Sequence, residues 1–345
     1  MGKYLDEYVG QENFKERVKI AIDSSIIKKT PFPHTLMAGP PGLGKSRLAE
    51  IIAKETGAIF HSYLATSIET EKHVTAIFKK LSLENYDLKT GRINNYKNWT
   101  PEIIFIDEIH NLSRKLTEIF HTALENRTIT IKSRNFQKGT IEPVRCWLPY
   151  FTLIGATNYL GSLSKPFRDR FQITLSFEIY SDEDIKTLIK NKSQKYYKVK
   201  ISNEATEYLS TKSRGVPRIA LSFLAKAYDI SVVREKTNNV KRITLEDVKK
   251  MFDIEQIDEF GLTRLDRKAL GYLVTSSRPI GLKSLAQAID EDVQTVENII
   301  EPYLVKIGFV IRTGSGRFIT DKGKDYLDRD APDILHPVTP NFKED

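Results

Sequence analysis

Residues 39–46 read Gly-Pro-Pro-Gly-Leu-Gly-Lys-Ser, a complete match to the phosphate-loop pattern G-x-x-x-x-G-K-[ST]. The largely apolar residues 34–38 before the loop predict a short buried strand, and residues 47–54 after it have the apolar spacing of a helix. The motif needs this context, because backbone N–H groups at the helix start then surround phosphate groups. The sequence therefore predicts a nucleotide site, and a chance glycine turn before a helix is the alternative.

The side chains of this loop supply a charge and a metal ligand. Lys45 places an ammonium group toward the terminal phosphates of ATP, and the Ser46 hydroxyl can bind Mg²⁺. The loop residues that we expect to contact ATP are Gly42, Leu43, Gly44, Lys45, Ser46 and Arg47.

A second motif, residues 102–108, is an apolar strand that ends in two carboxylates. Ligands of a parallel sheet bind at the carboxyl ends of its strands, so Asp107 can reach Mg²⁺ and Glu108 can reach the attacking water. This pair predicts hydrolysis of ATP and not binding alone. Two solvated acids that end a strand are the alternative.

A third apolar strand, residues 151–156, becomes polar at Thr157 and Asn158. The side-chain amide of Asn158 can orient the water held by Glu108. Asn158 therefore joins Asp107 and Glu108 in the predicted catalytic set.

Two arginines, Arg168 and Arg170, bracket Asp169 directly after this strand. Arg170 is the better candidate for an arginine finger that reaches the nucleotide of a neighbouring subunit, and a surface salt bridge among the three residues is the alternative.

Arg218 follows Pro217, which can begin a helix. A cation in the first turn opposes the helix dipole, so this placement indicates an anionic ligand such as the γ-phosphate. An ordinary solvated arginine is the alternative.

The composition of the 345 residues, with 40% hydrophobic and 28% charged, is that of an ordinary soluble protein. No apolar run approaches the roughly eighteen residues of a membrane span, and residues 1–10 lack the core of a signal peptide. We therefore expect no membrane partner and a cytoplasmic location. One cysteine and six histidines predict neither a disulfide framework nor a zinc cluster. The net charge of +8 is a weak indication of a polyanionic partner.

Residues 1–180 alternate short strands with helices, which predicts an α/β domain built on a parallel sheet. The expected strands are residues 35–38, 59–63, 103–106 and 151–156. Residues 181–256 read as a smaller helical domain that opens on a helix start at Ser181.

Residues 257–330 predict a winged helix, since three helical segments precede a hairpin. The helices are expected at residues 265–276, 282–289 and 293–307, and the hairpin at residues 309–320. Residues 331–345 show no periodicity and read as an extended tail.

The hairpin carries Arg312 and Arg317 on either side of residues 313–316. Like charges across a hairpin are unfavourable unless an anion lies between them, and DNA phosphates would serve. No aromatic stacking platform accompanies the arginines, so we expect contacts to the DNA backbone that are indifferent to sequence. A solvated hairpin with incidental arginines is the alternative.

These motifs together are typical of AAA+ ATPases. Their detailed sequences resemble those of the RuvB family, the motors of Holliday junction branch migration. The stretches that carry the resemblance are residues 5–13, 39–46, 105–110, 151–157, 167–171, 215–220, 279–282, 301–304, 308–309 and 312–313. The resemblance therefore includes the third domain as well as the ATPase signatures.

The resemblance implies an ATP-driven ring, a hexamer on DNA, that pulls double-stranded DNA at four-way junctions beside a RuvA-like partner. It implies a large ATPase domain, a helical lid and a DNA-binding winged helix. It makes Arg170 the finger in trans and Arg218 the sensor of the lid. The further positions that it assigns to the nucleotide pocket or the subunit boundary are Tyr8, Val9, Tyr180, Glu125, Asn126 and Arg127.

Three departures from the family pattern stand out. The Leu-Arg-Pro that usually precedes residue 5 is missing, and Lys3 is the available substitute for its arginine. A polar insertion is centred on residues 85–99, where an added surface loop costs little. The hairpin at residues 128–147, with which the family contacts its RuvA partner, differs in sequence from the family pattern around residues 134–138.

Two rival functions share most of these signatures. One is a clamp-loader-like or initiator-like AAA+ switch in DNA replication, in which the nucleotide state controls the loading of partners. The other is a nucleotide-regulated transcription or assembly factor whose wing binds passively. Continuous displacement of a branched duplex would separate the motor from both.

Overall fold

The computed structural model of the chain describes residues 3–81, 86–87, 92–93, 100–135, 140–237 and 240–330. The chain forms two compact units that divide between Tyr180 and Ser181. Each unit has its own hydrophobic core. None of the described helices is long and apolar enough to cross a membrane.

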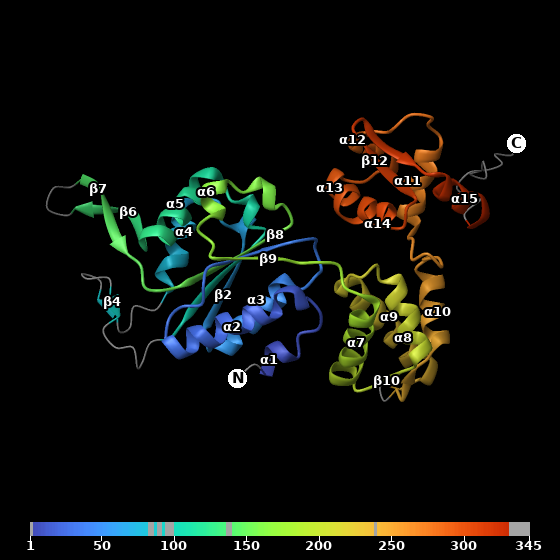
Figure 1. Ribbon diagram of the computed structural model, residues 1–345, viewed down its shortest axis with the longest axis horizontal. Helices are drawn as coiled ribbons and strands as arrows, with labels where there is room; N and C mark the ends of the chain where they lie inside the picture. The colour runs from blue at the N-terminus through green and yellow to red at the C-terminus, as the bar shows by residue number, and fades with distance from the viewer. Residues whose placement is uncertain are drawn as a thin grey trace, which may run out of the picture. The chain divides into compact units, whose positions relative to one another are not determined.

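The first unit is built on a sheet of five parallel strands in the order β2-β5-β8-β1-β9 (Figure 1). The strands are β1 (Thr35–Ala38), β2 (Ile59–Leu64), β5 (Glu102–Asp107), β8 (Thr152–Thr157) and β9 (Ile173–Ser176). The α/β class and the four predicted strands are confirmed. Strand β9 is not predicted, because exposed Thr174 and Ser176 interrupt its apolar pattern.

The strand order brings the ends of three strands together. Strand β8 lies between β5 and β1, and the register pairs Ile106 with Gly155 and Ala38 with Thr157. The carboxyl ends of β1, β5 and β8 therefore meet at one edge of the sheet, where ligands of such sheets bind. The phosphate loop leaves from the end of β1.

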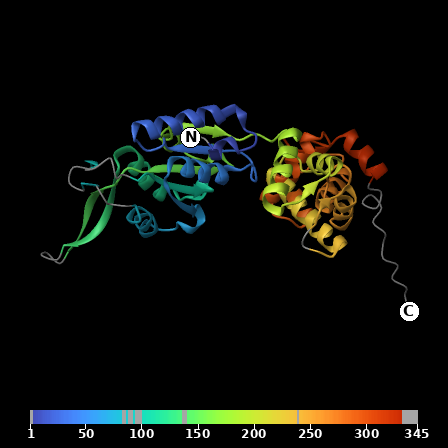
Figure 2. The same cartoon turned by 90° about the horizontal axis from the view of Figure 1, so that it is seen from below.

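Helices cover both faces of this sheet (Figures 1 and 2). One face carries α1 (Lys3–Asp6), α2 (Glu12–Lys28) and α3 (Lys45–Thr56); the other carries α4 (Glu71–Lys79), α5 (Arg114–Asn126) and α6 (Lys165–Arg168). Ile104 and Ile106 of β5 belong to the same buried core as Phe78 of α4 and Phe120 of α5. Since side chains alternate along a strand, Phe105, which lies between these two isoleucines, faces the opposite side of the sheet, where α3 lies.

Two antiparallel pairs lie outside the sheet. Strands β6 (Thr128–Asn135) and β7 (Thr140–Trp147) form a long hairpin after α5 (Figure 1). Strands β3 (Tyr86–Asp87) and β4 (Arg92–Ile93) form a short pair within the insertion. The rest of the insertion, residues 136–139 of the hairpin and the tail at residues 331–345 lie outside the described residues.

The second unit begins with the helical lid. Its elements are α7 (Asp182–Lys192), α8 (Asn203–Lys212), α9 (Pro217–Glu235), α10 (Leu245–Ile254) and the parallel pair β10 (Lys200–Ile201) and β11 (Arg242–Ile243). The predicted helix start at Ser181 is confirmed, because its Oγ accepts a hydrogen bond from Asp184 N at 3.1 Å.

The winged helix follows the lid. Its elements are α11 (Arg264–Val274), α12 (Leu282–Ile289), α13 (Val293–Thr295), a π-helical turn at Val296–Ile300, α14 (Glu301–Lys306), β12 (Val310–Thr313), β13 (Gly316–Ile319) and α15 (Asp321–Asp330). The predicted helices and hairpin are confirmed. Helix α15 is not predicted, since only Tyr326 and Leu327 carry it into the core and the rest of its sequence is strongly polar.

Gly155 of β8 generates a stability prediction. A Cβ atom there would lie 2.7 Å from Ile109 Cδ1 and 3.4 Å from Leu36 Cδ1, and both neighbours are fully buried. We expect Gly155→Val to lower the free energy of unfolding by about 1–3 kcal/mol through overpacking, measured by urea denaturation. Gly161→Ala is the control, because nothing lies within 4 Å of a Cβ at Gly161. Equal midpoints for the two variants would contradict this packing.

Candidate functional site

The phosphate loop joins β1 to α3 and turns on glycines. Gly39, Gly42 and Gly44 have φ angles of 146°, 80° and 94°, in the region that favours glycine. A Cβ atom at Gly39 would lie only 2.7 Å from Phe177 O. Because α3 begins at Lys45, the N–H groups of its first turn have no partner within the helix and are available to an anion held by the loop.

Lys45 is buried, with 7% of its surface exposed, and its ammonium group is surrounded by oxygen atoms. Nζ donates to Gly39 O at 2.6 Å, to Pro40 O at 2.9 Å and to Asn158 Oδ1 at 2.8 Å. A buried charge needs such partners to offset its loss of water. The loop therefore holds a positive charge at the start of α3.

Asn158 connects Lys45 to Glu108. Its Oδ1 accepts from Lys45, and its Nδ2 donates to Glu108 Oε1 at 2.9 Å. The ammonium, the amide and the carboxylate, which the sequence predicts one by one, thus form a single chain of hydrogen bonds. Asn158 and Glu108, the predicted water-handling pair, therefore lie in direct contact.

Ser46 and Asp107 converge beside the loop. The Ser46 hydroxyl donates to Asp107 Oδ2 at 3.4 Å, and Asp107 Oδ1 accepts from Glu108 N at 3.0 Å. Glu108 has a φ of 51°, so the chain turns sharply after β5. A hydroxyl and a carboxylate oxygen are ligands that Mg²⁺ prefers. The two side chains therefore fit a magnesium ion.

His110 and Thr157 belong to this cluster, although the sequence assigns no role to them. His110 Nδ1 lies 3.0 Å from Thr157 Oγ1 and 3.3 Å from Glu108 Oε2. Thr157 Oγ1 also accepts from Tyr159 N at 3.0 Å. The imidazole thus holds the second carboxylate oxygen of Glu108 against the end of β8. The Glu-x-His spacing after β5, together with a polar residue at the end of β8, is the signal that could have found it.

Two buried tyrosines close one side of the phosphate loop. Tyr180 Oη lies 3.3 Å from both Tyr8 Oη and Leu43 O, and Tyr8 Oη donates to Gly44 O at 3.5 Å. Burial raises the pKa of Tyr8, so its hydroxyl stays protonated. Val9 is half-buried next to Tyr8. The structure therefore brings the tyrosines and the loop together, as the resemblance implies.

Arg170 follows α6 (Lys165–Arg168), and its side chain lies against the last turns of α5. Its Nε donates to His121 Nε2 at 3.0 Å, and its terminal nitrogen lies 3.0 Å from Glu125 Oε1. About a third of its side chain, 35%, is exposed. Its carboxylate partner is thus Glu125 of α5. Asn126 ends α5, and Arg127 follows it with its guanidinium 3.9 Å from the Tyr150 ring centroid.

Arg218 and Arg47 are both exposed. Pro217 occupies the first turn of α9, so Arg218 lies in that turn as predicted. It belongs to the second unit. Arg47 lies in the first turn of α3 and pairs with Glu50 at 3.0 Å.

The wing arginines already have an anion between them. Arg312 and Arg317 are direct cross-strand neighbours, and both guanidinium groups pair with Glu301, which is 2% exposed. Arg317 lies 3.0 Å from Glu301 Oε2, and Arg312 Nε pairs with Oε1. The anion that the like charges require is therefore Glu301 and not a DNA phosphate, and DNA contact by Arg312 and Arg317 stays a prediction. Arg312 keeps 54% of its side chain exposed, whereas Arg317 keeps 18%.

A phosphate loop, an acidic strand end and an adjacent polar strand end on a parallel sheet, followed by a helical lid, define an AAA+ ATPase. The chain matches three family models in succession. They are the Holliday junction DNA helicase RuvB P-loop domain at residues 2–177, the RuvB AAA lid domain at residues 180–258 and the RuvB C-terminal winged helix domain at residues 259–328. The chain belongs to the RuvB family.

Known proteins of this family resemble the chain over nearly its whole length. A Holliday junction branch migration complex subunit RuvB of Prochlorococcus marinus (strain AS9601) is 39% identical over 94% of this chain and 86% of the relative. The corresponding subunit of Ehrlichia ruminantium (strain Gardel) is 38% identical over 94% and 90%. The solved structure of the Thermotoga maritima RuvB Holliday junction branch migration motor is 32% identical, with a TM-score of 0.77 and coverage of 94% and 99%.

The hydrogen-bond chain from Lys45 to Glu108 separates binding from hydrolysis. We expect Lys45→Ala to abolish nucleotide binding, because it removes the charge at the loop. Glu108→Gln should keep binding and lower the rate of phosphate release by about 10²–10⁴, the usual contribution of a general base. Titration with a fluorescent nucleotide and a phosphate-release assay measure the two effects. Glu118→Gln, at a largely exposed carboxylate of α5, is the control; equal affinity of Lys45→Ala and the wild type would refute the assignment.

Proposed function

We propose that this protein is the motor subunit of a Holliday junction branch-migration complex, which hydrolyses ATP to move double-stranded DNA through a four-way junction. The observation that carries the proposal is the succession of the three RuvB domains along one chain. The relatives named above have the same activity in their names. The rival switch in replication and the passive DNA-binding factor lack this support.

The hydrolytic step follows from the chain of hydrogen bonds at the phosphate loop. Lys45 exchanges its Asn158 contact for a terminal phosphate oxygen when ATP binds, since a phosphate is the stronger partner for an ammonium group. Asn158 then orients a water molecule beside Glu108, which accepts its proton. His110 and Thr157 hold Glu108 in place. Mg²⁺, when held by Ser46 and Asp107, supplies positive charge to the phosphates.

Arg170 acts on the nucleotide of a neighbouring subunit in a homo-oligomeric ring, which we take to be a hexamer on DNA. The support is the position of its side chain against the last turns of α5. Glu125 and His121 orient the Arg170 guanidinium there, and about a third of the side chain is still exposed. Asn126 and Arg127 continue the same edge and would meet the neighbour there. An arginine supplied in trans accelerates phosphoryl transfer by about 10³–10⁵. Arg218, in the first turn of α9, senses the γ-phosphate from the lid.

Arg312 contacts DNA phosphate with the exposed part of its side chain. Glu301 neutralises one of the two wing charges, so the pair offers one net positive charge to the backbone. Arg317, largely buried, fixes the wing in this arrangement.

A RuvA-like junction-binding protein is the expected partner of the β6–β7 hairpin. The support is that Val144 and Trp147 expose 42% and 40% of their surfaces on β7, where they offer apolar contact area to a partner. For a protein with this function we expect a cytoplasmic location.

The proposed function is tested by measuring ATP hydrolysis with and without four-way junction DNA, and by following junction movement with fluorophores on opposite arms. The expected result is hydrolysis that rises with junction DNA and drives continuous movement of the junction. Hydrolysis without any junction movement, in the presence of a RuvA protein, would favour the replication switch.

Mixed rings test the finger. Arg170→Ala and Lys45→Ala proteins are each expected to be inactive, since one lacks the finger and the other the phosphate charge. Mixing them should restore part of the ATPase rate, because an intact finger can then meet an intact loop across a boundary. Rings that contain both variants yet show no recovery would assign Arg170 a structural role, and Arg168 would be examined next.

The wing is tested by the salt dependence of DNA binding. We expect Arg312→Ala to lower the slope of log K against log salt by about 0.9 per engaged protomer, the value for one phosphate. Arg317→Ala should leave the slope nearly unchanged and lower the melting temperature, because it removes one partner of a buried carboxylate. A loss of about two phosphates in the double variant would show that Glu301 does not neutralise the pair.

A further inference from the structure

Arg214 belongs to the lid, but its side chain is bonded to the winged helix. It lies between α8 and α9 and is 8% exposed. One terminal nitrogen donates to Asp266 Oδ2 at 2.5 Å and to Gly261 O at 2.8 Å, and the other donates to Asp266 Oδ1 at 3.3 Å. Asp266, 1% exposed, lies in the first turn of α11. Two parallel, charge-assisted hydrogen bonds fix direction as well as distance.

The ring of Tyr303 supports the same guanidinium group. The guanidinium carbon lies 4.4 Å from the ring centroid, which is a cation–π contact. Tyr303 belongs to α14, and its hydroxyl donates to Phe260 O at 2.7 Å. Arg214 is therefore held by two helices of the winged helix and by the linker that precedes them.

The backbone at Arg214 is held in an uncommon conformation. Arg214 has a φ of 61° and Gly215 one of 71°. A long side chain adopts the left-handed region only where its surroundings hold it there. Val216 N then donates to Ser213 O at 3.0 Å, and α9 begins at Pro217. Arg218, the proposed phosphate sensor, thus follows Arg214 by one tight turn.

The linker between α10 and α11 is fixed by its own hydrogen bonds. Asp258 accepts from Phe260 N and Leu262 N, each at 2.9 Å, and from the hydroxyl of Tyr326 in α15. A Cβ atom at Gly261 would lie 2.9 Å from Lys212 O, so the linker packs directly on the end of α8.

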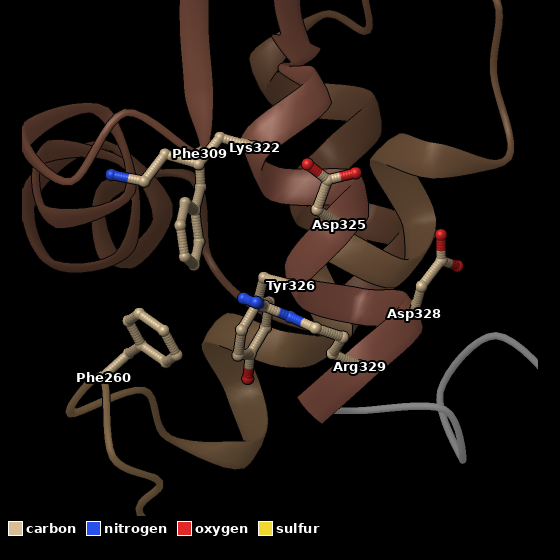
Figure 3. A pocket seen from close by; sticks show the side chains of 7 residues that line it. All are labelled: Phe260, Phe309, Lys322, Asp325, Tyr326, Asp328 and Arg329. Atoms are coloured by element: carbon tan, nitrogen blue, oxygen red, sulfur yellow. The ribbon is translucent and has the colours of Figure 1, made fainter.

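Phe260 anchors the linker in the winged helix. Its ring centroid lies 5.6 Å from that of Phe309 and 5.3 Å from that of Tyr326. The three rings line one hollow, of 330 Å³, together with further side chains of α15 such as Lys322 and Arg329 (Figure 3). A flexible interdomain linker would have few such contacts.

We infer that Arg214 is a positioning residue that joins the lid and the winged helix into one rigid body, so that a lid movement triggered at Arg218 is passed undiminished to the wing on DNA. The coupling role rests on the proposed function, whereas the rigid body does not. Rigid-body movement of a domain is a common way to transmit a local change over distance. Bending between α10 and α11 would instead absorb the movement.

The lid contains a matched ion pair for comparison. Arg234 pairs with Asp247 through two hydrogen bonds at 2.7 and 3.0 Å. Asp247 is 2% exposed and caps the start of α10 through Thr244, as Asp266 caps α11 through Thr263. Arg234→Lys therefore breaks the same kind of fork wholly within the lid, whereas Arg214→Lys breaks it between the lid and the winged helix. Lysine cannot reproduce either fork.

The first measurement is the distance between two spin labels in the full chain. Cys146→Ser removes the lone cysteine, and the labels are placed at exposed Gln194 of the lid and exposed Gln294 of the winged helix. The expected distribution is narrow and unchanged by ADP or a non-hydrolysable ATP analogue. It should broaden in Arg214→Lys and stay narrow in Arg234→Lys. Asp266→Asn, which keeps an acceptor for the Thr263 cap, is measured in parallel in case Arg214→Lys unfolds.

Either of two results would overturn the rigid body. One is a wild-type distance that shifts with nucleotide, and the other is a distribution that stays narrow in both Arg214→Lys and Asp266→Asn. These outcomes do not depend on any DNA activity, so they are distinguishable from a failure of the proposed function.

The second measurement is the number of junction steps per ATP hydrolysed. Arg214→Lys should lower this ratio roughly fivefold or more, the lower end of typical coupling between sites, while DNA-independent hydrolysis and DNA affinity stay near wild type. Arg234→Lys should leave the ratio unchanged. An equal fall in both variants would assign Arg214 a merely structural role. If no protein, wild type included, moves a junction while the distances behave as expected, the proposed function fails and the rigid body stands.

Discussion

The buried ammonium group of Lys45 is the constraint on which the site depends. An ion with so little exposure needs several oxygen acceptors, and the loop carbonyls and Asn158 supply them. The pairing of β8 with β1 brings Asn158 to the loop carbonyls, and β5 lies on the other side of β8. The same arrangement places Glu108 against the other end of the Asn158 amide. Nucleotide binding and hydrolysis thus share one small network of hydrogen bonds, with the binding charge of Lys45 at one end and the carboxylate of Glu108 at the other.

Much of this site can be predicted from sequence because its signals are local. The phosphate loop, the acidic pair and Asn158 each follow an apolar strand directly, and the sheet rule then brings them together. His110 does not directly follow a strand, and its contact with Thr157 depends on the sharp turn at Glu108, so only the weaker Glu-x-His spacing indicates it. Strand β9 and helix α15 are not predicted from the sequence, because too few of their residues are buried to give a periodic apolar pattern.

The wing shows where a physical argument from the sequence is incomplete. Two arginines across a hairpin do require an anion, but the chain supplies it as Glu301 from α14. The separation of eleven residues between Arg312 and Glu301 hides this partner from any local pattern. Buried carboxylates paired with arginine recur at Asp247 and Asp266, where each also caps a helix. Tertiary ion pairs of this kind are set by packing and not by spacing.

The Arg214–Asp266 pair also determines where the chain can be cut or recombined. A break between Tyr180 and Ser181 falls between two units with separate cores. A break in the linker before α11 would instead leave a buried guanidinium in one fragment and a buried carboxylate in the other, each without its counter-ion. Residues 181–330 are therefore the smallest piece that keeps the lid and the winged helix together with this ion pair intact. Exchanging winged helices between relatives would require the lid to be carried with them.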